Sequence, residues 1–110
     1  MNEKQLREPA FLILTALAAG PQHGYGVIQD VSQISDGEVT LKAGTLYGVL
    51  DRLRADGLVE VEREEIVSSR LRRYYRLTPK GSKLLAAEAA RLQANAAAAL
   101  SRLDVAEGTI

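Results

Sequence analysis

Residues 41–63 read LKAGTLYGVLDRLRADGLVEVER and combine a helix pattern with a strand pattern. Four apolar residues have the i, i+3, i+4, i+7 spacing of a helix that is buried along one side: Leu46, Val49, Leu50 and Leu53. Asp56-Gly57 then ends the helix, because glycine readily adopts the left-handed backbone that is common at helix C-termini. The alternating LVEVER predicts a strand. The other face of the helix is polar, so it has to contact water or a polar partner.

The residues before this stretch predict two more helices. Pro9 suits the first turn of a helix that ends at Gly20-Pro21. This helix is apolar almost all round, so it is either central in the fold or shared with a partner. A second helix is predicted over residues 23–35, with four residues facing inward: Val27, Ile28, Val31 and Ile34. Residues 39–41, VTL, predict a short strand.

The residues after it predict a hairpin and a long helix. LVEVER at 58–63 and RRYYRL at 72–77 form the two strands, joined by residues 64–71. Thr78-Pro79 gives an N-cap followed by proline at the first helical position. Further along, a heptad seam that needs another helix to cover it is formed by Leu85, Ala89, Leu92, Ala96, Ala99 and Leu103. Residues 104–110 lack this period, and we expect the tail to be frayed.

Length and composition limit the class of protein. A chain of 110 residues fits one domain with a modest core. Its 14 basic and 14 acidic residues cancel, but residues 42–83 hold ten Lys or Arg against six Asp or Glu. The absence of cysteine excludes a disulfide framework, a thiolate metal site and a cysteine nucleophile. No apolar segment approaches the roughly 20 residues of a membrane span, and the N-terminus does not resemble a signal peptide, so we expect a soluble cytoplasmic protein.

The order of these elements predicts the fold. Three helices, a hairpin and an amphipathic last helix are typical of a mainly α (α+β) winged helix-turn-helix with a two-stranded wing and a C-terminal dimerisation helix. We expect residues 1–79 to form the DNA-binding domain, and residues 80–110 to form the dimerisation helix and the frayed tail. In such a fold the third helix enters the major groove of double-stranded DNA, and the wing lies along the backbone or an adjacent minor groove. Gly44 and Gly48 would let the helix backbone approach the DNA closely.

Candidate site residues follow from this fold. The predicted DNA face combines the polar side of the third helix with the wing and consists of Lys42, Thr45, Tyr47, Arg52, Arg70 and Arg72. Cations beside hydroxyls and aromatic rings suit phosphate contacts. The alternative is a solvated wing, whose arginines pair across the hairpin with Glu60, Glu62 and Glu64. We also expect a homodimer, whose interface consists of Phe11, Leu14, Leu85, Ala89, Leu92, Ala96, Ala99 and Leu103.

Three motifs resemble the PadR family of transcriptional regulators. They are HGYGV at 23–27, AGTLYGVLDRLRADGLVE at 43–60 and RRYYRLTPKG at 72–81, in the family's order. The resemblance covers about residues 10–85, and the single short C-terminal helix is similar to the smaller branch of the family. It implies a homodimeric repressor that binds an imperfect inverted repeat and that, in many members, is released by a small, often aromatic, effector.

The third helix departs from the family pattern at three positions. Lys42 and Ala43 stand where the family commonly has Ser or Thr followed by proline, and Gly48 replaces another proline. Lys42 cannot cap the helix. Either Thr40 or a shifted start provides the cap, or about 1 kcal/mol of capping is absent.

The other polar residues give little support for a different chemistry. His23 is the only histidine, so we expect no metal site, and a role at the start of its helix is favoured. Tyr25, Tyr74 and Tyr75 either pack in the core or line an effector cavity. No nucleophile with its base is visible, so we expect neither an enzyme nor a cofactor. The alternative function is a winged-helix module that binds protein rather than DNA, with which the acidic strand is compatible.

Overall fold

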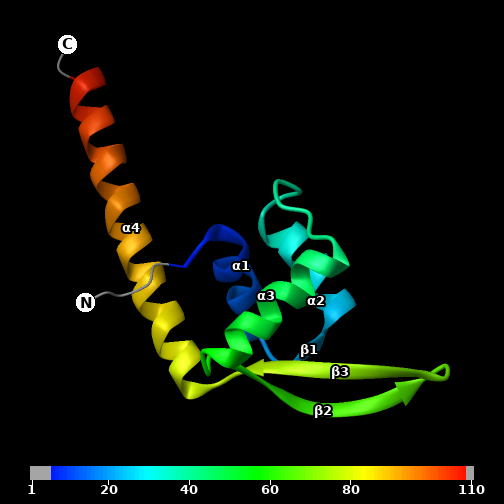
Figure 1. The fold of residues 1–110 in the computed structure, drawn as a ribbon. Coiled ribbons are helices and arrows are strands. Elements are labelled where there is room, and N and C mark those ends of the chain that lie inside the picture. Colours follow the sequence, from blue (N-terminus) through cyan, green and yellow to red (C-terminus); the bar gives the residue numbers. More distant parts are fainter. Residues whose placement is uncertain (1–5, 109–110) are drawn as a thin grey trace.

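The computed structural model describes residues 6–108 of the chain, and the side chains of residues 6–104. Within this range the chain forms a three-stranded antiparallel sheet of order β1-β3-β2, with α1, α2 and α3 on one side of it (Figure 1). The elements are α1 (Glu8–Ala18), β1 (Gln22–His23), α2 (Gly24–Ile34), α3 (Ala43–Ala55), β2 (Val59–Val67), β3 (Arg70–Leu77) and α4 (Pro79–Gly108). The predicted winged helix-turn-helix is confirmed, and β2 and β3 form its wing.

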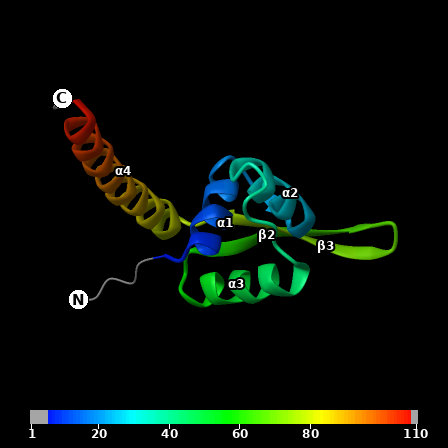
Figure 2. The same ribbon diagram turned by 90° about the horizontal axis from the view of Figure 1, so that it is seen from above.

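Helix α1 is the central helix of the domain. It contacts α2, α3, α4 and β3, and Figure 2 shows it between α2 and the first turns of α4. Ile13 and Leu14 are fully buried in the core that closes around it. Of the two alternatives that its apolar sequence left open, the central position is therefore confirmed. The expectation that Leu14 contacts a second chain is wrong, because its own domain encloses the side chain.

Helices α2 and α3 are joined by an extended segment rather than by a strand. Residues 39–41, where a short strand was expected, are not in a strand. Val39 instead donates its N–H to the Ser35 hydroxyl at 3.0 Å, and Leu41 packs into the core. The sequence did not predict β1, because its two residues are too short for a pattern. Ile34, expected to face inward, is 42% exposed at the end of α2.

The wing is longer than the sequence predicted. Most of residues 64–71, expected to connect the strands, extends β2 and β3 instead, and Ser68 and Ser69 form the turn. Both serines have positive φ angles, 52° and 65°, as in the turns that close two-residue hairpins. Side chains alternate along β3, since Tyr75 is buried whereas its neighbour Arg76 is exposed. The wing tip therefore projects beyond the helices (Figure 1).

Thr78 holds the start of α4 against the end of α3. Its hydroxyl accepts the N–H of Gly81 at 3.0 Å, which confirms the predicted N-cap, and donates to the carbonyl of Gly57 at 2.6 Å. Gly57 has a φ of 78°, as the predicted helix stop requires. A Cβ at Gly81 would overlap the carbonyl oxygen of Leu58. The first turn of α4 is thus packed closely against the chain that follows α3.

The rest of α4 extends away from the domain. The molecule measures 65 Å along its longest axis, and Figure 1 shows α4 projecting from one end. The expectation of a frayed tail is wrong over residues 104–108, which continue the helix, while residues 109–110 lie outside the described residues. Ala106 and Glu107 favour the helical state, and extending an existing helix requires no new nucleus. Among the described residues, no helix is long and apolar enough to cross a membrane.

Candidate nucleic-acid interface

Two glycines lie on the outer face of α3. Leu46, Leu50 and Leu53 are buried on the inner face as predicted, and Gly44 and Gly48 lie opposite them. A Cβ built at either glycine meets no atom within 4 Å. The domain itself therefore has no steric need for glycine here, although glycine inside a helix costs roughly 0.5–1 kcal/mol relative to alanine. This face suits close approach by another molecule.

The side chains predicted for the DNA face on α3 do not form one cluster. Lys42, Thr45 and Tyr47 are exposed near the N-terminus of α3. Lys42 occupies the N-cap without a side-chain hydrogen bond, so the capping energy is absent. Thr45 and Tyr47 lie on opposite flanks of the glycine face, given 100° per residue. Arg52 lies about 15 Å from Lys42 along the helix axis, beside α1 and α4.

A cleft of about 270 Å³ separates the wing from α2 and α3. Arg70 and Arg72 line it from the wing, and Tyr47 lines it from α3. A Cβ at Gly24 would overlap the Tyr47 hydroxyl, so the glycine of the HGY motif allows this tyrosine to lie against the start of α2. The structure thus brings three of the predicted DNA-face residues to one cleft.

Tyr25 also lines this cleft and was not predicted as a DNA-face residue. It is 65% exposed at the start of α2. The signal was present in the sequence, because Tyr25 lies outside the apolar stripe that contains Val27 and Val31. Its hydroxyl gives the cleft a further polar group.

The wing arginines divide into two groups. Three form ion pairs, with shortest N–O distances of 2.7–2.9 Å: Arg63 with Glu62, Arg73 with Glu64 and Arg76 with Glu60. Arg70 and Arg72 have no ion pair with any side chain that the structure describes. Pairing across the hairpin, as expected of a solvated wing, therefore accounts for Arg73 and Arg76, whereas Arg63 pairs with its neighbour on β2. No described side chain neutralises the charges of Arg70 and Arg72.

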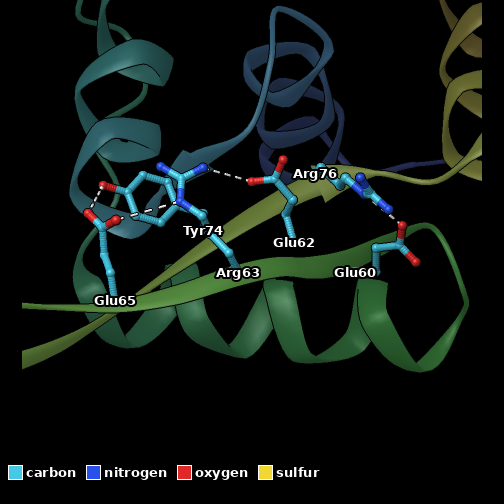
Figure 3. A network of polar contacts seen from close by, with 6 residues as sticks. All are labelled: Glu60, Glu62, Arg63, Glu65, Tyr74 and Arg76. Carbon is cyan, nitrogen blue, oxygen red and sulfur yellow. Dashed lines mark hydrogen bonds and ion pairs between the residues drawn. The ribbon is translucent and has the colours of Figure 1, made fainter.

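Arg63 belongs to a network on the wing (Figure 3). Its guanidinium carbon lies 3.8 Å from the centre of the Tyr74 ring, and the Tyr74 hydroxyl donates to Glu65 at 2.9 Å. The network forms at a bulge, where Glu62 is the extra residue of β2 between Val61 and Arg63. These contacts stabilise the bend of the wing, and Glu62 and Glu65 neutralise the charge of Arg63.

His23 connects this network to α2. Its Nδ1 accepts the N–H of Gly26 at 3.2 Å, so it caps α2, and its ring meets that of Tyr74 edge to face with centroids 5.4 Å apart. The cap requires a neutral imidazole with the proton on Nε2. Burial lowers the pKa of His23, Arg72 lowers it further, and Glu65 opposes this shift. The described residues contain no group of three side chains that could hold a metal ion.

The predicted dimerisation seam is mostly uncovered in the single chain. Leu85 is half-buried against the core, as is Phe11 of α1. Leu92 is 41% exposed and Leu103 57% exposed, and Leu100 beside the seam is 63% exposed. The alanines of the seam are exposed too: Ala89, Ala96 and Ala99. An apolar row thus runs along a helix that the domain does not cover.

A groove of about 1050 Å³ separates α1 from the end of α3 and the start of α4. Its apolar lining includes Leu6, Val49, Leu53, Leu58 and Leu84, and Arg52, Lys80 and Lys83 also line it. The tyrosines considered for an effector cavity lie elsewhere, in the core or beside the wing. The groove borders both α3 and α4 and has a largely apolar lining.

A helix-turn-helix followed by a two-stranded wing, with a long helix appended, defines a winged-helix protein. The model of the transcriptional regulator PadR-like family matches residues 13–87. The chain is 38% identical over 85 residues to the transcriptional regulator Rv3488 of Mycobacterium tuberculosis. These 85 residues make up 77% of this chain and 76% of that protein. The chain therefore belongs to the PadR-like family of transcriptional regulators, as its motifs predicted.

Two other proteins extend the comparison. An uncharacterized 37.1 kDa protein in transposon TN4556 of Streptomyces fradiae is 42% identical over 78 residues, which span 71% of this chain but 21% of that protein. The crystal structure of Bacillus subtilis PadR in complex with operator DNA has a TM-score of 0.64 at 24% identity, over 72% of this chain and 45% of that one. The similarity to the B. subtilis PadR structure shows a shared fold.

Proposed function

We propose that this chain is a homodimeric, sequence-specific DNA-binding repressor that reads the major groove with α3. The observation that carries the proposal is the glycine face of α3, which is open to solvent and unexplained by packing within the domain. Beside it, Thr45 and Tyr47 offer hydroxyls for base or phosphate contacts. That the fold resembles a B. subtilis PadR bound to operator DNA supports the same use of the fold.

The wing supplies the phosphate contacts in this proposal. Arg70 and Arg72 line the cleft next to α3 and carry charges that no described side chain neutralises. A DNA backbone phosphate would supply the missing anion, and the released counterions would make binding weaken as salt rises. Lys42 and Arg52 extend the positive charge along α3 in both directions.

Dimerisation through α4 completes the proposed binding unit. The seam from Leu85 to Leu103 is long enough to pair with a second copy, and its alanines allow two helices to approach closely. A two-fold dimer would set its two reading helices one DNA turn, about 34 Å, or a multiple of it, apart. We therefore expect an inverted-repeat operator. The division at Pro79, between DNA-binding domain and dimerisation helix, is part of the proposal.

The test is a salt titration of DNA binding. Genomic fragments captured with the purified protein would be searched for a shared inverted repeat, and affinity for it measured at several salt concentrations. Replacing Arg70 and Arg72 by alanine should weaken all sequences alike and flatten the salt slope by about one unit for each lost phosphate contact. The matched control is Arg73→Ala with Arg76→Ala, which removes paired arginines of the same hairpin and should change the slope less. An unchanged slope in the first variant would exclude the wing from the DNA.

A module that binds protein instead of DNA is the alternative. Its support was the acidic strand, but Glu60, Glu62 and Glu64 are each paired with a wing arginine in the structure. Their charges are thus not available to attract a basic partner. Binding through leucine and alanine would also be nearly independent of salt, so the same titration separates the two functions.

We propose the groove between α1, α3 and α4 as the site of a small hydrophobic or aromatic effector. The groove is lined by the end of α3 and the start of α4. A bound effector that prefers one arrangement of these two helices would therefore change the affinity for DNA. Titrating aromatic compounds against the operator complex tests this step. A Leu84→Trp variant, which fills the groove, should abolish any such response; a response that persists would place the effector elsewhere.

A further inference from the structure

Two large apolar side chains lie exposed at the wing tip. Ile66 of β2 is 76% exposed and Leu71 of β3 is 58% exposed. They are direct partners in the strand register, so they lie side by side on one face of the hairpin. The turn of Ser68 and Ser69 is only one residue further along. Neither side chain belongs to the hydrophobic core or packs against it.

Single exposed apolar residues are common on protein surfaces, but an adjacent pair at the end of a projecting hairpin is less so. The strand position does not require apolar residues, because threonine or tyrosine would satisfy the same β-propensity. An exposed isoleucine on the edge strand β2 also favours aggregation. The pair therefore indicates contact with another molecule.

The charges around the tip identify the kind of molecule. Arg70 and Arg72 flank Leu71 along β3, and neither has an ion pair among the described side chains. Because side chains alternate along a strand, these arginines point to the opposite face of the hairpin from Leu71. A hairpin tip with an apolar pair on one face and unpaired cations on the other matches the DNA minor groove, whose walls are deoxyribose and whose rims are phosphates. The tip is also continuous with the cleft that borders α3, since Leu71 lines that cleft.

We infer that Ile66 and Leu71 form an apolar wedge that enters the minor groove beside the site of α3, while Arg70 and Arg72 contact the phosphates on its rims. This inference rests on the proposed function. Isoleucine and leucine are among the side chains that minor-groove proteins insert between base steps. In the minor groove, G·C pairs differ from A·T pairs by the protruding N2 amino group of guanine. The wedge therefore favours A·T pairs at the operator positions that face the wing.

The experiment compares three versions of the captured operator, in which the wing-facing flank contains A·T, G·C or inosine·C pairs. Inosine lacks the guanine N2 amino group but keeps the major-groove edge of guanine. The unmodified protein should bind the A·T and inosine·C versions equally, and the G·C version about tenfold more weakly. Ile66→Thr with Leu71→Thr keeps β-propensity and should bind all three versions alike, with an unchanged salt slope. Because both residues are exposed, the thermal unfolding midpoint should also be unchanged.

Matched variants separate the wedge from its surroundings. Arg70→Ala should flatten the salt slope and keep the discrimination between flanks, which is the opposite result to the wedge variant. Retained discrimination in the wedge variant would overturn the inference. The inference would also be overturned if the wedge variant bound DNA like the unmodified protein but lost regulation in a transcription assay, because Ile66 and Leu71 would then contact a protein. If the unmodified protein binds no operator in a salt-dependent manner, the proposed function itself fails, and this outcome is distinct from the other two.

Discussion

Leucines are buried in the domain of residues 6–79 but exposed on the outer part of α4. In the domain, Leu46 and Leu50 are fully buried, and the core is complete within one chain. On α4, Leu92, Leu100 and Leu103 are 41–63% exposed. A leucine in the domain therefore stabilises this chain, whereas a leucine on the outer part of α4 can be buried only by a second molecule. The two regions should respond differently to substitution.

Charging the seam should have the largest effect. Leu92→Glu with Leu103→Glu would place like charges against each other at the proposed two-fold axis, so the dimer should dissociate into folded monomers. Operator affinity should fall about 100-fold or more, because two half-sites are no longer bound together. Light scattering and DNA titration measure the two effects. Ser101→Glu, on the opposite side of α4, is the control and should remain dimeric.

If the Leu92→Glu, Leu103→Glu variant stays dimeric at micromolar concentration, α4 does not form the dimer interface. The exposed leucines would then have some other partner, and Phe11 of α1 would become the leading interface residue. Circular dichroism should show the domain unchanged in either case, because both substituted leucines are exposed in the single chain.

The joint between the two regions should be the next most sensitive place. At Gly81 an added Cβ would overlap the backbone carbonyl of Leu58, so Gly81→Ala should displace α4 and destabilise the protein by about 1–3 kcal/mol. Chemical denaturation at fixed protein concentration measures this loss. Ser82→Ala, at the next residue, is exposed and should be nearly neutral. Equal stability of the two variants would show that the Leu58 backbone can move aside.

Much of the fold could be predicted because local chemistry sets it. The stripe of α3, the stop at Gly57 and the cap at Thr78 each depend on a few neighbouring residues, and all three are confirmed. The short strand expected at residues 39–41 fails because a side chain, Ser35, takes the Val39 N–H. The buried Leu14 and the extended wing depend on contacts between distant segments, which periodicity does not report.

The candidate site was less predictable than the fold. The sequence placed cations and glutamates on the wing, but it did not show which of them pair. Register decides only part of this: Arg73 and Arg76 pair with the glutamates opposite them, Glu64 and Glu60, and Arg70 lies opposite Val67. Arg72 lies opposite Glu65 without an ion pair, because Glu65 accepts from Tyr74 and pairs with Arg63 instead. The sequence indicates that Tyr25 is exposed, because it lies outside the apolar stripe of α2, but the cleft that it lines forms only when the wing folds against α2.

Gly48→Ala should separate stability from binding within the domain. The position is inside α3 and faces open space, so alanine should stabilise the protein by about 0.5–1 kcal/mol. Its methyl group would face the DNA, and we expect operator affinity to fall about tenfold. Denaturation and DNA titration on the same sample measure both. A variant that gains stability and keeps full affinity would show that DNA does not approach α3 at this residue.

The pH dependence through His23 should be the smallest effect. Burial and the nearby Arg72 hold the pKa of His23 in the folded domain below the 6.5 of a free histidine, so the unfolded chain binds more protons as the pH falls through about that value. The free energy of unfolding should therefore be greatest above pH 6.5 and decrease as the pH is lowered through it. His23→Asn keeps an N-cap side chain but does not titrate, so it should lose less stability between pH 7 and about pH 5 than the unmodified protein. Denaturation curves at the two pH values measure the difference. Equal losses would mean that protonated His23 is tolerated beside Arg72 and that other groups set the pH dependence.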